Sequence, residues 1–136
     1  MKEKTQKRCM QGGYYFFAYR PTAQQWAVLK KAAAVGIAFG TIIDDLILEH
    51  PETIEMLILQ YIGQPRSSRQ GTGSQMTYNV SGTIREVFTY IISNGISASQ
   101  VINDLFDLYM LDILQHVEKR AQQFERVKKI MTSLGD

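Results

Sequence analysis

The feature that most constrains this chain is an internal repeat at a constant offset of 59 positions. Residues 36–47 read GIAFGTIIDDLI and residues 95–106 read GISASQVINDLF, with five identical positions. The apolar phase also matches upstream, where the following residues align: Val28 with Val87, Leu29 with Phe88, Ala32 with Ile91, and Ala33 with Ile92. Because a repeated unit buries its apolar face against its neighbour, the chain is expected to fold as two equivalent halves packed together.

The first half reads as a strand followed by helices. Aromatic side chains favour a strand over residues 14–20. Thr22 and Gln25 have capping-box spacing at the start of a helix, and Gly36 is the expected C-terminal stop of that helix. Two later helices are predicted, from about residue 38 and over residues 52–62.

The second half repeats this order after a polar, glycine-rich linker. A strand is predicted over residues 75–80, and Ser81 is the expected cap of a helix that ends near Gly95. Ser97 is the expected cap of the next helix, which contains no proline and is expected to continue to about Leu134.

The C-terminal part of that helix carries a surplus apolar stripe. Its heptad positions are Met110, Ile113, Val117, Arg120, Phe124, Val127, Met131 and Leu134, of which seven are apolar. The favoured interpretation is packing on the helix at 52–62. The alternative is self-association, or docking of a partner, through residues 110–134.

Charge is arranged in blocks of alternating sign. The net charge is only +2, but residues 1–36 carry +6 and residues 63–85 carry +3. Between and after them, residues 37–62 carry −5 and residues 86–112 carry −4, and the last block, 113–136, carries +2. A fold that gathers the positive blocks on one side would have a nucleic-acid face. Ordinary charge scatter explains the pattern equally well.

Several function classes are disfavoured by composition. No apolar run approaches the ~20 residues of a membrane span, and the basic N-terminus lacks the apolar segment of a signal peptide, so a cytoplasmic protein with no membrane partner is expected. The single Cys9 excludes a disulfide framework within the chain and a cysteine-based zinc site. His50 and His116 lie far apart without ligand-like neighbours. We therefore expect no metal, no cofactor and no enzymatic activity.

The order strand, Pro-Thr turn, helix, G-I-S-x-S turn, helix resembles the ribbon-helix-helix family, which includes the Arc-type and CopG-type repressors. Tyr19–Trp26 is similar to the family's strand-to-helix junction, and Gly95–Ser99 to its turn between helices. The resemblance covers residues 14–50 and 75–110. It implies a mainly α fold with one two-stranded antiparallel ribbon, in which two repeats form a single pseudo-two-fold domain.

This resemblance implies five segments. They are a basic arm over 1–13, a first repeat with a short extra helix over 14–62, a linker over 63–74, a second repeat over 75–110 and a helical extension over 111–136. Since both halves lie in one chain, the minimal folded unit is expected to be a monomer.

In this family the ribbon enters the major groove of double-stranded DNA. The polar alternation of the second strand predicts base contacts by Gln75, Thr77 and Asn79, and the offset adds Phe16, Ala18 and Arg20. An alignment shifted by one residue would instead turn Tyr15, Phe17 and Tyr19 outward.

Phosphate contacts are expected where the second helix of each repeat begins. The predicted residues are Ala38 and Phe39 in the first repeat and Ser97, Ala98 and Ser99 in the second. The arm adds Lys2, Lys4, Lys7 and Arg8, for which a merely solvated tail is an equal alternative.

Tandem units in one chain also resemble the accessory proteins of conjugative relaxosomes and of T-DNA border processing. The expected function is therefore sequence-specific binding of double-stranded DNA as such an accessory factor, with a relaxase or another DNA-processing protein as partner. Two alternatives stay open. One is a transcriptional repressor of the same fold, and the other is a helical protein-binding adaptor that has lost DNA binding.

Overall fold

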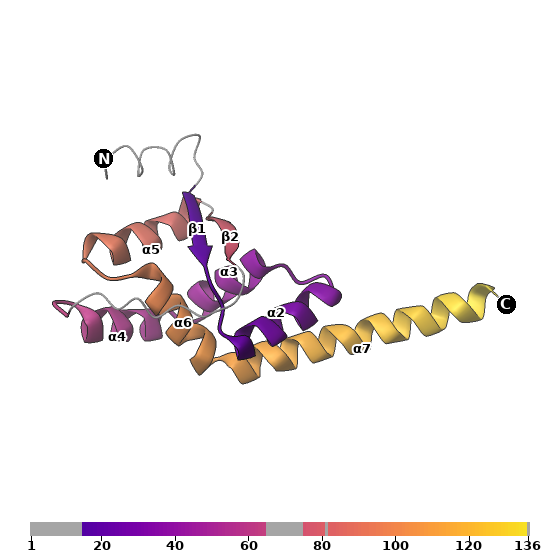
Figure 1. Cartoon of the computed structure of the whole chain (residues 1–136). Coiled ribbons are helices and arrows are strands. Elements are labelled where there is room, and N and C mark those ends of the chain that lie inside the picture. Colours follow the sequence, from indigo (N-terminus) through magenta and orange to yellow (C-terminus); the bar gives the residue numbers. More distant parts are fainter. Residues whose placement is uncertain (1–14, 65–74, 81, 136) are drawn as a thin grey trace.

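The chain is mainly helical with one two-stranded antiparallel sheet (Figure 1). The computed structural model describes residues 15–64, 75–80 and 82–135, apart from the side chains of residues 15, 16, 79 and 83. In chain order the elements are β1 (Tyr15–Tyr19), α2 (Ala23–Ala34), α3 (Phe39–Glu49), α4 (Pro51–Tyr61), β2 (Met76–Val80), α5 (Gly82–Ser93), α6 (Ala98–Leu108) and α7 (Met110–Gly135). The sequence-based expectation of a mainly α fold with a single ribbon is confirmed.

The two strands that pair are about sixty positions apart in the sequence. Tyr15 lies opposite Val80, and the ladder continues to Tyr19 opposite Met76. This antiparallel pairing of residues near 15–20 with residues near 75–80 is the one that the sequence predicts.

Corresponding helices in the two halves begin 59 positions apart. The helices that follow β1 begin at residues 23, 39 and 51, and those that follow β2 begin at residues 82, 98 and 110. The turns correspond as well, because Gly36 (φ +82°) and Gly95 (φ +76°) both adopt the left-handed conformation that glycine permits after a helix.

Side-chain caps mark the starts of α2 and α6, and Ser81, the expected cap of α5, lies outside the described residues. Thr22 and Gln25 form the predicted capping box at the start of α2. Ser97 accepts a hydrogen bond from the backbone N–H of Gln100 at the start of α6, whereas Ala38 at the start of α3 supplies no side-chain cap.

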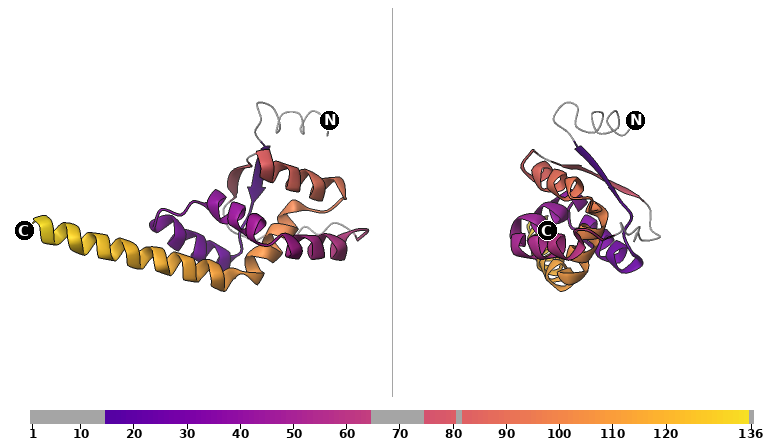
Figure 2. Two further views of the ribbon diagram at one scale, coloured as in Figure 1. Left: turned by 180° about the vertical axis from the view of Figure 1, so that it is seen from behind. Right: turned by 90° about the vertical axis from the view of Figure 1, so that its left-hand side faces the viewer.

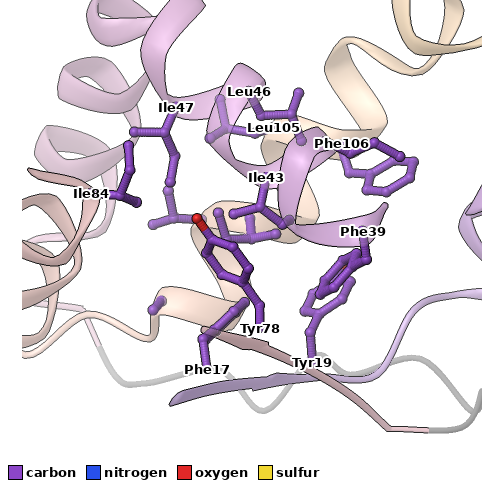
Figure 3. Close-up of a cluster of buried hydrophobic side chains, with 14 of the residues drawn as sticks. Phe17, Tyr19, Phe39, Ile43, Leu46, Ile47, Tyr78, Ile84, Leu105 and Phe106 are labelled. Atoms are coloured by element: carbon purple, nitrogen blue, oxygen red, sulfur yellow. The ribbon is translucent and has the colours of Figure 1, made fainter. Parts of the chain in front are cut away.

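The core lies between the ribbon and the helices. Phe17, Tyr19, Tyr78 and Val80 project from one face of the ribbon and are buried. They meet side chains of α3 and α6 (Figure 3), among them Ile43, Leu46, Leu105 and Phe106. Burial of each such side chain contributes about 1.5–3 kcal/mol to folding stability. The ribbon is therefore held by its inward face, and its outward face is not needed for packing.

The helix expected to continue unbroken from Ser97 to about Leu134 is in fact two helices. α6 ends at Leu108, and Tyr109 leaves the helical conformation with φ −112° and ψ 20°. The ring of Tyr109 stacks on His50, with 3.4 Å between ring centroids, and its hydroxyl shares a 2.6 Å hydrogen bond with Thr53. Tertiary contacts of this one side chain therefore interrupt a segment that has no proline or glycine.

The break redirects the C-terminal helix. The favoured expectation placed it on the helix at 52–62, and this is wrong, because α7 packs along α2 and against α6. Val117 is its one fully buried residue among those described. Beyond it α7 projects away from the body as a single long helix (Figure 2).

Candidate nucleic-acid interface

The outward face of the ribbon lies at the surface of the molecule. Ala18 and Thr77 form a directly opposed pair in the ladder, and both are exposed. Arg20 and Gln75, which follow β1 and precede β2 just beyond the Tyr19–Met76 pair, are exposed as well. Four of the six predicted base-contact residues therefore lie together on one accessible face. The other two, Phe16 and Asn79, pair through their backbones, and their side chains lie outside the described part.

The inward face excludes the shifted alignment. Phe17 and Tyr19 are 5% and 2% exposed, so neither is available at the surface. Phe17 packs against Phe88 of α5, with 4.9 Å between ring centroids, and the Tyr19 ring stacks on Phe39 at 6.0 Å. These contacts on one side of the ribbon orient the small and polar side chains on the other.

A buried polar cluster fixes the end of β1. The Tyr19 hydroxyl donates to Gln25 Oε1 at 2.7 Å, and Gln25 Nε2 donates to Asn103 Oδ1 at 3.0 Å and to Asp107 Oδ1 at 2.9 Å. The backbone N–H of Thr22 also donates to Gln25 Oε1, at 3.1 Å. One fully buried side chain thus links β1, α2 and α6 directly beside Arg20.

Burial raises the pKa of the Tyr19 hydroxyl, although its hydrogen bond to Gln25 acts in the other direction, and the negative charges of Asp107 and Asp104 raise it further. Tyr19 therefore stays protonated and keeps donating. The sequence identified Gln25 only as half of a capping box. Its burial depends on two acceptors from α6 and on a donor from β1, which a local motif does not reveal.

Tyr78 of β2 is hydrogen-bonded to the first half of the chain. The Tyr78 hydroxyl donates to the Asp44 carboxylate of α3, and Tyr78 is itself 6% exposed. Burial raises the pKa of Asp44, with a further contribution from the negative charge of Asp45. Both strands are thus fastened by a tyrosine hydroxyl to the second helix of the other half of the chain.

The two helix starts proposed for phosphate contact offer backbone groups. The first N–H groups of a helix have no acceptor within it. The side chains of Phe39 and Ala98 are 8% and 7% exposed, so any contact there would use the backbone N–H. Ala38 is exposed, and Ser97 and Ser99 are half-buried. Lys2, Lys4, Lys7 and Arg8 of the basic arm lie outside the described residues.

Two further surveys of the described residues gave negative findings. No helix there is long and apolar enough to cross a membrane. No group of three or more His, Cys, Asp or Glu side chains in that part of the chain is placed to hold a metal ion.

Comparisons of the chain with family models, with curated proteins and with solved structures gave no match.

Proposed function

We propose that the two halves are ribbon-helix-helix repeats related by a pseudo-two-fold axis, and that the outward face of the ribbon reads double-stranded DNA in the major groove. The proposal of DNA reading rests on one observation. The ribbon has an exposed face, formed by Ala18, Arg20, Gln75 and Thr77, and its other face is buried.

The strand register supports the pseudo-two-fold axis. Ala18 lies opposite Thr77, and these two residues are themselves 59 positions apart, so the repeat offset and the ladder share one centre. The pairs on either side exchange under the same offset, with Phe17 opposite Tyr78 and Tyr19 opposite Met76.

The hydrogen bonds of the two tyrosines support it independently. Tyr19 donates to Asn103 at 3.2 Å, and Tyr78 donates to Asp44. Both partners in one bond are related to those in the other by 59 positions. The equivalent contact is therefore made twice, once in each direction across the ribbon, as a two-fold axis requires.

The chemistry of the outward face supports base reading. A two-stranded ribbon fits the major groove, about 12 Å wide, where each base pair shows a distinct pattern of donors and acceptors. Arg20 can donate two hydrogen bonds to guanine, Gln75 can pair with adenine, and Thr77 can bond either a donor or an acceptor. The starts of α3 and α6 would position the ribbon through phosphates.

The two halves of the reading face differ. Ala18 corresponds to Thr77 and Phe16 to Gln75, so each half would present its own side chains. A homodimer presents the same side chains twice, whereas a single chain with two unlike halves suits an asymmetric DNA site. With the family resemblance, this supports an accessory role in conjugative DNA transfer or T-DNA processing, next to a relaxase or another DNA-processing protein.

The proposal is tested by selecting bound duplexes from a random library and measuring affinity for the selected and for a random sequence. Arg20→Ala or Gln75→Ala should reduce affinity for the selected site by about 1–3 kcal/mol and affect random DNA less. Arg126→Ala is the matched control, because it removes the same charge from the exposed distal part of α7. If no duplex is enriched and none binds above background at low salt, the adaptor alternative replaces DNA binding.

A further inference from the structure

Two apolar surfaces of the described chain have no cover. The first is on the projecting part of α7, where Phe124, Val127, Met131 and Leu134 follow helical spacing and are 43–78% exposed, with Ile130 beside them. The second is a groove of about 490 Å³ between α4 and α5. Its lining includes the buried Ile54 and Ile58 and the exposed Leu59 and Tyr90, at 66% and 59%.

The charges bordering these surfaces are opposite. At 3.6 residues per turn, Lys119 and Lys128 border the α7 stripe on its two sides, and Arg120 lies within it. Of the acidic residues of that stretch, Glu118 falls on the opposite face of the helix, whereas Glu125 lies beside Lys128, with 3.6 Å between its carboxylate and the Lys128 ammonium group. The groove is bordered by Glu55 from α4 and Glu86 from α5, and no lysine or arginine of the described part of the chain lines it.

The two halves of the chain differ at the position of the groove. By the 59-residue offset of the helices, α4 and α5 correspond to the first turns of α7 and to α2. α7 packs directly along α2, whereas a groove opens between α4 and α5. The groove thus lies between the two helices whose counterparts in the other half, α7 and α2, are in direct contact.

We infer that the distal stripe of α7, residues 118–135, docks in the α4–α5 groove of a second copy of this chain. At 1.5 Å per residue this stretch is about 27 Å long, compared with about 17 Å for the 11 residues of α4. One contact then covers both apolar surfaces and places basic borders against acidic ones. Pairing of two α7 stripes would instead leave the groove open and bring the basic borders together.

The direction of α7 determines the kind of assembly. It leaves the body on the side away from α4 and α5 (Figures 1 and 2), so a chain does not fill its own groove. A copy that donates its helix to one neighbour keeps its groove for another. Such head-to-tail contacts are heterologous and continue from copy to copy rather than closing as a two-fold dimer.

Sequence composition disfavours the linker as occupant. Residues 65–74 read PRSSRQGTGS and contain no aliphatic or aromatic side chain other than Pro65. The basic arm is tested directly by a chain that lacks residues 1–13, which should self-associate like the full chain.

The test uses two variants that each silence one surface at exposed positions without changing charge. Phe124→Ser with Met131→Ser silences the helix, and Leu59→Ser with Tyr90→Ser silences the groove. The matched controls are Gln122→Ser on the opposite face of α7 and Gln60→Ser on α4, both exposed. Sedimentation velocity without DNA should show concentration-dependent assembly of the full chain and both controls, and monomers for each silenced variant.

The decisive sample is an equimolar mixture of the two silenced variants. One retains a working groove and the other a working helix, so the mixture should form a complex of two chains that does not grow further. If the groove variant assembles as well as the full chain, α7 pairs with α7 and the inference is wrong. A full chain that stays monomeric at all accessible concentrations, or a mixture that stays monomeric, would also overturn it. None of these outcomes depends on DNA binding.

Discussion

Replacement of Gly40 by alanine tests how tightly Tyr78 is held beneath the ribbon. Gly40 is the second residue of α3, and a Cβ atom there would lie 2.8 Å from both Cδ2 and Cε2 of the Tyr78 ring. The ring has little room to move, because it is buried and its hydroxyl donates to Asp44. Overpacking of this kind typically costs about 1–3 kcal/mol.

An opposing term is the helix propensity of alanine, which exceeds that of glycine by about 0.8–1.0 kcal/mol in a helix interior and by less in a first turn. The steric term is larger, so Gly40→Ala should lower the free energy of unfolding by about 1–2 kcal/mol. At the size of this chain, 1 kcal/mol corresponds to about 4 °C in Tm.

Urea denaturation followed by circular dichroism measures this effect. Gly82→Ala is the matched control, because Gly82 is the first residue of α5 and a Cβ there meets no atom within 4 Å. The penalty at Gly40 should also shrink when Tyr78 is replaced by leucine, in a double-mutant cycle. A Gly40→Ala chain that is as stable as Gly82→Ala would refute the close packing described here.

Three other predictions concern the polar cluster around Gln25, the carboxyl group of Asp44 and the basic N-terminal arm. Gln25→Leu should lower the free energy of unfolding by about 2–3 kcal/mol, because it leaves buried hydrogen-bonding groups of Tyr19 and Asn103 without their partner, whereas the exposed Gln24→Leu should change it little in urea titrations. Burial raises the pKa of Asp44, so this carboxyl contributes stability at low pH that is lost as the pH rises through its folded-state pKa. Asp44→Asn, which keeps an acceptor for Tyr78, should therefore be the more stable protein at neutral pH, and the difference in urea midpoint should vanish below about pH 4; a constant difference across pH would contradict the assignment. Deletion of residues 1–8 should weaken binding to the selected and to random DNA alike, and it should make the affinity depend less on salt concentration. An unchanged salt dependence would exclude phosphate contact by the arm.

The sequence predicted the helices and strands themselves better than it predicted which of them pack together. Capping residues such as Thr22 and glycines such as Gly36 act over a few positions, so the helix boundaries followed from local physics. The pairing of β1 with β2 followed from the repeat and the family resemblance.

Packing partners could not be predicted in the same way. The break at Tyr109 depends on a ring and a hydroxyl contributed by His50 and Thr53, more than fifty positions away. The heptad pattern of α7 identified an apolar face, but it carried no information on whether α2 or α4 would cover it. The groove between α4 and α5 was also missed, since an open space depends on how two helices diverge and not on either sequence.

For the candidate interface, the alternation of β2 indicated which side chains point inward, and Tyr78 and Val80 are buried accordingly. The polar cluster around Gln25 gave no signal in the sequence beyond the cap. A glutamine at that position is as consistent with an exposed first turn as with a fully buried one.

Contact between the ribbon and DNA is tested most directly by titrating the isotopically labelled chain with duplex DNA and following the amide chemical shifts in NMR spectra. We expect the largest changes on the ribbon, at Ala18, Arg20, Gln75 and Thr77, and at the starts of α3 and α6, with the distal part of α7 little affected. Changes confined to α7 or to the α4–α5 groove, or no change with any duplex at low salt, would contradict DNA reading by the ribbon.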